Sequence, residues 1–87
     1  MSAAIESRVG VIAILVKDAK PETVDQLNHY LGEFGEIVIG RMGIPYRERQ
    51  LKVISIIVDG TTDQIGALTG KLGNLPGITT RATLLTK

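Results

Sequence analysis

A strand–helix–strand pattern occurs twice in this chain of 87 residues. Four apolar residues with helical spacing recur 41 positions later: Val24, Leu27, Leu31 and Phe34 return as Ile65, Leu68, Leu72 and Leu75. An apolar run typical of a β-strand precedes each set, at 11–16 and 53–58, and a shorter segment follows each. The repeat predicts a ferredoxin-like α+β sandwich with the order βαββαβ, in which a four-stranded antiparallel sheet carries two helices on one face.

The pattern also predicts where the elements begin and end. We expect strands at about 8–17, 36–43, 51–59 and 78–85, a first helix ending between 32 and 34, and a second helix ending near 73. Asp18 is expected to cap the first helix, and Thr61 with Gln64 forms a capping-box pattern before the second. Pro45 is expected to end the pairing of the second strand. We expect residues 1–7 to be a disordered tail and 8–87 to be a single domain.

Composition and motifs exclude several function classes. The formal charge of +1 argues against direct binding of nucleic acid by this chain alone. The absence of cysteine removes disulfides and thiolate metal sites, and the lone His29 has no second histidine to share a metal, so no metal site or cofactor is expected. No catalytic motif is present, and we expect the protein not to be an enzyme. With no membrane-spanning run and no signal-peptide layout, a cytoplasmic location is expected.

Both faces of the two central strands are apolar. Alternate residues fall on opposite faces of a strand, yet neither parity set in 9–16 or 51–58 is polar. Helices can cover only one face, so the other must expose an apolar patch, which monomers seldom tolerate. A second copy of the chain is the simplest cover, and we expect a dimer or a larger homo-oligomer. Ile14 and Ile56 are central in these strands and are candidates for close packing or for the interface.

The connection after the second predicted strand contains a candidate ligand site. Arg41 and Arg47 flank a bend shaped by Gly43 and Pro45, and both could hold a small anionic ligand through paired hydrogen bonds. The alternative is a hairpin bend whose charges are simply solvated.

The second predicted helix contains three glycines at positions i, i+4 and i+7, namely Gly66, Gly70 and Gly73. Glycine within a helix costs roughly 1 kcal/mol relative to alanine, so a face of glycines predicts the close approach of another element. That element could belong to the same subunit, to a neighbouring subunit or to a ligand.

These two segments carry a family resemblance. The strings Arg41–Pro45, Arg47-Glu48 and Ile65–Gly73 resemble a small family of ACT-like proteins described as regulators of the iron-only hydrogenase system. The resemblance implies a regulatory role, with a fold similar to the ligand-binding half of nickel-responsive repressors, whose histidine and cysteine ligands this chain does not supply. More distantly, the chain resembles amino-acid-binding ACT domains, but its loop from Asp18 to Glu22 departs from their Asp-x-Pro-Gly pattern.

Residues and resemblance together predict a non-enzymatic, oligomeric regulatory domain. It would sense a small ligand at a subunit interface. The resemblance implies that it acts in transcriptional regulation connected with the hydrogenase system. The alternative is a structural or partner-docking protein with no small ligand.

Overall fold

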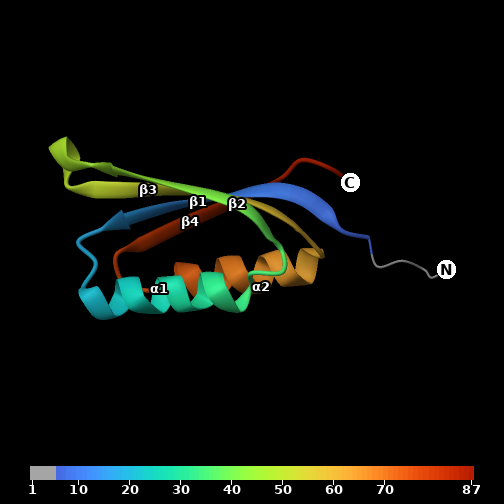
Figure 1. The fold of residues 1–87 in the computed structure, drawn as a ribbon, viewed down its shortest axis with the longest axis horizontal. Coiled ribbons are helices and arrows are strands. Elements are labelled where there is room, and N and C mark those ends of the chain that lie inside the picture. The colour runs from blue at the N-terminus through green and yellow to red at the C-terminus, as the bar shows by residue number, and fades with distance from the viewer. Residues whose placement is uncertain (1–5) are drawn as a thin grey trace.

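The computed structural model describes residues 6–87 of the chain, and residues 1–5 of the predicted tail lie outside the described part. Its elements are β1 (Arg8–Lys17), α1 (Pro21–Glu33), β2 (Val38–Tyr46), a 3₁₀ turn (Arg47–Arg49), β3 (Leu51–Gly60), α2 (Thr62–Gly73) and β4 (Ile78–Leu84). The strands pair antiparallel in the order β2-β3-β1-β4, and both helices lie on one side of the sheet (Figure 1). The predicted ferredoxin-like fold is therefore confirmed.

The two helices begin differently. The N-cap of α1 is Lys20, which makes no capping hydrogen bond with its side chain, and Pro21 opens the helix. Asp18 does not cap α1 as predicted, because it lies two residues earlier with a left-handed φ of 56°. At α2 the capping box is present: the Gln64 backbone N–H donates to Thr61 Oγ1 at 3.1 Å, and the Thr61 N–H donates to Gln64 Oε1 at 2.9 Å.

Replacing Thr61 by alanine is expected to lower the free energy of unfolding by about 1 kcal/mol. The substitution removes the acceptor for the Gln64 N–H at the start of α2. Denaturant unfolding followed by circular dichroism measures the loss. Thr62→Ala is the matched control, since Thr62 is exposed and is not the cap. Equal losses in both variants would contradict this account.

Strand β2 is longer than predicted and passes through Pro45, pairing with β3 as far as Tyr46 and Leu51. The hydrogen bond from the Asp59 N–H to Ile37 O shows that odd-numbered residues of β3 bond toward β2. By the alternation of an antiparallel ladder, Pro45, opposite Lys52, then directs its backbone nitrogen away from β3. The missing N–H costs no ladder bond at such an edge position, so the prediction that Pro45 ends the pairing was wrong.

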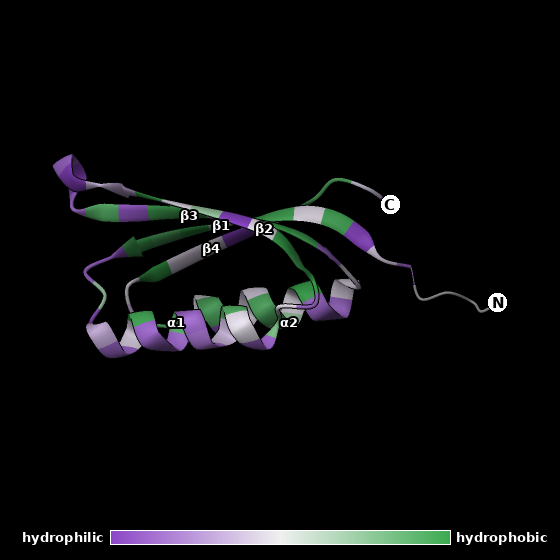
Figure 2. Ribbon diagram, viewed as in Figure 1, coloured by the Kyte–Doolittle hydropathy of each residue, from purple (hydrophilic) through white to green (hydrophobic). Residues whose placement is uncertain are grey.

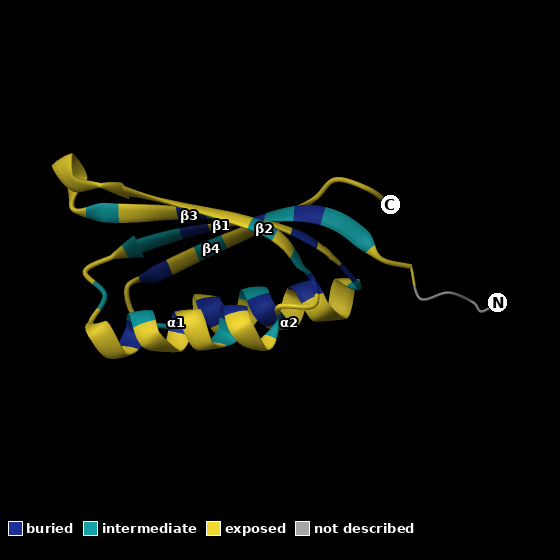
Figure 3. Ribbon diagram, in the orientation of Figure 1, coloured by how far each residue is buried: buried dark blue, intermediate teal, exposed yellow. Residues whose placement is uncertain are grey.

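The hydrophobic core lies between the sheet and the helices, where the buried residues of both layers meet (Figures 2 and 3). It consists of Ile12, Ile14, Leu27, Leu31, Ile37, Ile54, Ile56, Val58, Ile65, Leu68, Leu72 and Ile78. The turn into β4 needs glycine at position 77, where φ is +77° and a Cβ atom would lie 2.5 Å from Lys17 O. This core fixes which face of the sheet remains open.

Candidate functional site

The β2–β3 hairpin projects beyond the ends of the helices and carries the predicted anion site (Figure 1). Arg41 pairs with Ile56 and therefore lies on the helix side of the sheet, where its Nη2 donates to Asn28 Oδ1 of α1 at 3.4 Å. Arg47 lies in the 3₁₀ turn at the tip. About five strand residues separate them, or roughly 17 Å, so one chain does not bring these two arginines together.

Lys52 is a further cation of this hairpin, and the sequence analysis did not single it out. Gly43 and Pro45 lie on the helix side of the hairpin, as does Lys52, which pairs with Pro45. A methyl group at Gly43 would lie 3.0 Å from Lys52 Cε, so the glycine gives the lysine side chain room to cross the strand. The placement of Lys52 depends on the pairing register of β2 with β3, which the sequence does not report.

Charge on the hairpin is mostly positive and unpaired. Residues 41–52 include Arg41, Arg47, Arg49 and Lys52 against the single carboxylate of Glu48. Within residues 6–87 the one ion pair joins Lys71 Nζ to Glu33 Oε1 at 3.4 Å, so Glu48 neutralises no arginine at salt-bridge distance. The hairpin therefore presents cations that an anionic group could contact.

The face of the sheet opposite the helices is apolar and open. By pairing register, Val53 and Ile57 of β3 share this face with Ile44 of β2. Their exposed fractions are 45%, 39% and 53%. Met42 and Tyr46 also have large exposed fractions on the same face. The predicted apolar patch is present, and we call this surface the open face.

Ile14 and Ile56 lie on the other side of the sheet. Their exposed fractions are 1% and 0%, and both belong to the core beneath the helices. Their contribution is close packing within the chain, and neither side chain reaches the open face.

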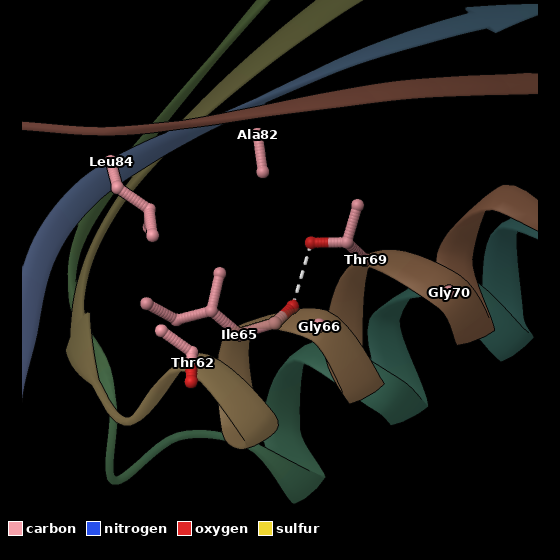
Figure 4. Close-up of a pocket in the computed structure, with 7 residues that line it drawn as sticks. All are labelled: Thr62, Ile65, Gly66, Thr69, Gly70, Ala82 and Leu84. Carbon is pink, nitrogen blue, oxygen red and sulfur yellow. Dashed lines mark hydrogen bonds between the residues drawn. The ribbon is translucent and has the colours of Figure 1, made fainter.

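The glycines of α2 differ from one another. A methyl group at Gly73 would meet Thr80 Oγ1 at 3.0 Å, whereas one at Gly66 or Gly70 would meet no atom of residues 6–87 within 4 Å beyond the helix backbone. These two glycines line a groove of about 480 Å³ between α2 and β4 (Figure 4). The remaining lining residues are Thr62, Ile65, Thr69, Ala82 and Leu84. Packing within the subunit therefore explains Gly73 but not Gly66 or Gly70.

Metal ligands do not gather in the described part of the chain. No three side chains of His, Cys, Asp or Glu among residues 6–87 are placed to hold a metal ion. His29 is exposed on α1 beside Tyr30, with ring centroids 6.0 Å apart. None of the helices described is both long and apolar enough to span a membrane.

Comparison with known proteins gives one family match. A family model described as "Iron-only hydrogenase system regulator, putative" matches residues 8–82. The uncharacterized protein TM1266 from Thermotoga maritima is 33% identical, with a TM-score of 0.87 over 93% of this chain and 100% of that one. No curated protein matches.

More distant solved structures share the fold alone. The ACT domain from GTP pyrophosphokinase of Chlorobium tepidum is 16% identical, with a TM-score of 0.72 over 88% of this chain and 99% of that one. The C-terminal domain of the MgtC protein from Mycobacterium tuberculosis is 8% identical, with a TM-score of 0.70 over 98% and 95% of the two chains.

Proposed function

Because this chain belongs to the family of iron-only hydrogenase system regulators, we propose that it is a non-enzymatic regulatory domain that assembles with itself and binds a small ligand at a subunit interface. The observation that carries the proposal is the open face, where apolar side chains of β2 and β3 are exposed together. A patch that groups so many large apolar residues is typical of an interaction surface. The ACT-like fold is consistent with a regulatory role, since it also occurs as a domain of GTP pyrophosphokinase.

Two copies that meet through their open faces would bury this patch. Sheets pack face to face about 10 Å apart, with their apolar side chains interdigitating. A small ligand bound at the margin of such an interface could then bias assembly, because it would contact both copies at once. Arg47 and Arg49 in the turn at the hairpin tip could supply the chemistry for an anion at this margin, whereas Arg41 and Lys52 lie on the helix side of the sheet.

Native mass spectrometry of protein purified from its own host tests the proposal. It reports the number of chains in the assembly and any retained small molecule in one measurement. An oligomer that carries a bound metabolite supports ligand sensing. An oligomer that never carries one, under conditions that preserve weak complexes, favours the alternative of a structural or partner-docking protein.

We expect the ligand to be a small carboxylate or phosphate held near Arg41 and Arg47. Guanidinium groups stay charged at working pH and match the geometry of these anions. Since the two arginines are far apart in one chain, a single ligand could touch both only where two chains meet, and Lys52 would assist Arg41 on the helix side.

Replacing Arg41 and Arg47 together by glutamine is expected to weaken anion binding at least about tenfold, because a hydrogen bond to a charged group contributes roughly 1.5–3 kcal/mol. Calorimetry against a panel of metabolite anions measures the change. Arg8→Gln with Lys87→Gln is the control, since it removes the same charge away from the hairpin. Binding that survives in the Arg41, Arg47 variant would place the site elsewhere. If no anion binds the wild type, the docking-protein alternative becomes the better explanation.

A further inference from the structure

Strand β4 is an edge of the sheet with an uncovered row of backbone groups. The Leu85 N–H donates to Val9 O and the Lys17 N–H donates to Gly77 O, so odd-numbered residues of this segment bond toward β1. By the alternation of an antiparallel ladder, Thr80, Ala82 and Leu84 direct their N–H and C=O groups away from the sheet. Such an edge is a template for pairing with another strand.

The two edges of the sheet are protected differently. Strand β2 has a register irregularity between Val38 and Gly40 and has Pro45 at an outward-facing position, and both features hinder pairing with another strand. Strand β4 has no proline and no register irregularity from Gly10–Leu84 to Val16–Ile78. The one feature of β4 that hinders pairing is Arg81, whose Nη1 donates to the outward-facing Thr80 O at 2.8 Å. That bond is exposed and local, so it can be exchanged for a backbone bond at little net cost.

The groove beside this edge has the shape and polarity for an added strand. It is bounded by β4 on one side and by Gly66 and Gly70 of α2 on the other, and none of its lining residues is charged (Figure 4). Each of these glycines destabilises the helix by roughly 1 kcal/mol relative to alanine. Outside the backbone of α2 itself, no atom of residues 6–87 lies near enough to require them, so a group from another molecule is expected to occupy the space.

We propose that a second copy of this chain fills the groove by pairing its β4 with β4 in an antiparallel, twofold-symmetric manner. The pairing would join the two sheets into one and bring the two α2 helices side by side. Ala82 and Leu84 lie on the helix side of β4, opposite Ile12 and Gly10, so the partner's copies of these side chains would enter the groove over Gly66 and Gly70. Leu84, now 39% exposed, would become buried.

A second copy fits this surface better than a charged partner would. In a twofold-symmetric antiparallel pair, residues near the axis lie close to their own counterparts, so a strand rich in one charge would repel its partner. Here the residues on the helix side of the edge, Thr80, Ala82 and Leu84, are uncharged, as is the groove. Arg81 is the one charged residue of β4 and lies on the opposite face of the sheet. This interface is separate from the open face and does not depend on the proposed function. If both interfaces form and their twofold axes intersect at right angles, the assembly closes at four chains.

Light scattering of Gly70→Leu at tens of micromolar tests the proposal. A Cβ atom at position 70 meets nothing within 4 Å among residues 6–87, and leucine favours helix, so the fold should persist while the side chain blocks the partner's strand. The mass is expected to fall to half the wild-type value with an unchanged circular dichroism spectrum. Gly32→Leu is the matched control, because Gly32 also has no atom within 4 Å but lies on α1 and is expected to leave the mass unchanged.

Amide hydrogen exchange gives an independent readout. In the wild type the N–H groups of Thr80, Ala82 and Leu84 should exchange slowly, and in Gly70→Leu they should exchange at least about tenfold faster. If Gly70→Leu fails to fold, Leu84→Arg takes its place in both measurements. An unchanged mass in these variants, fast exchange of the three amides in the wild type, or a wild-type protein that is a monomer would overturn the proposal.

Discussion

Lysine at both Ile14 and Ile56 is expected to leave the chain unfolded at room temperature. The two side chains have exposed fractions of 1% and 0% beneath the helices. Thr23 is the one polar residue among the buried residues of 6–87, so the core offers no carboxylate that could receive an ammonium group. Burying one unpaired charge costs several kcal/mol, and a small domain has only about 5–15 kcal/mol of stability in total.

Far-UV circular dichroism and a urea titration measure this loss. The double variant should lack native helix and sheet signals and show no cooperative transition. The matched control is Val53→Lys with Ile57→Lys, which places the same charges on the same sheet but on the open face. A folded Ile14, Ile56 variant with a normal transition would show that the core has been assigned to the wrong side of the sheet.

Much of the fold could be predicted because local and long-range signals agree. The repeated apolar pattern gave both helices and all four strands in the correct order. The Thr61–Gln64 pair was correct because a capping box depends on a few adjacent residues. The prediction that Asp18 caps α1 was wrong because the turn after β1 places the N-cap two residues later, at Lys20. No local signal in the sequence reports that geometry.

Features that depend on pairing register were harder to predict. Whether Pro45 ends β2 depends on which way its nitrogen points, and that follows from the register with β3. The same register decides that Arg41 faces the helices and that Lys52 lies beside Gly43. The sequence of the hairpin does not select one pairing register of β2 with β3, because several registers would bury a similar amount of apolar surface.

The assignment of faces was also beyond the sequence. Both parity sets of β1 and β3 are apolar, so hydropathy alone does not distinguish Ile56 from Ile57. The helices select one set because their crossovers place them on one side of the sheet. Apolarity on both faces was nevertheless the informative observation, since it predicted an exposed patch before its side was known.

Placing lysine at both Val53 and Ile57 is expected to disrupt the assembly and leave the fold intact. In the monomer both side chains face solvent, with exposed fractions of 45% and 39%, so lysine there costs little stability. In a face-to-face dimer each lysine would have to be desolvated or displaced, and each would meet the positive charges of the other copy. The expected weakening of self-association is at least about a hundredfold, since each desolvated charge costs more than 1.4 kcal/mol.

Light scattering at tens of micromolar should therefore show the mass of the wild-type assembly falling by half, with native circular dichroism. Gln26→Lys with His29→Lys adds the same charge to the exposed surface of α1 and should leave the mass unchanged. If pairing through β4 also occurs, the remaining species is a pair of chains, and adding Gly70→Leu should reduce it to the single 9.3 kDa chain. A wild-type protein that is already monomeric, or a Val53, Ile57 variant with the wild-type mass, would remove the open face as an interface. The apolar patch would then require a different partner, as the docking-protein alternative holds.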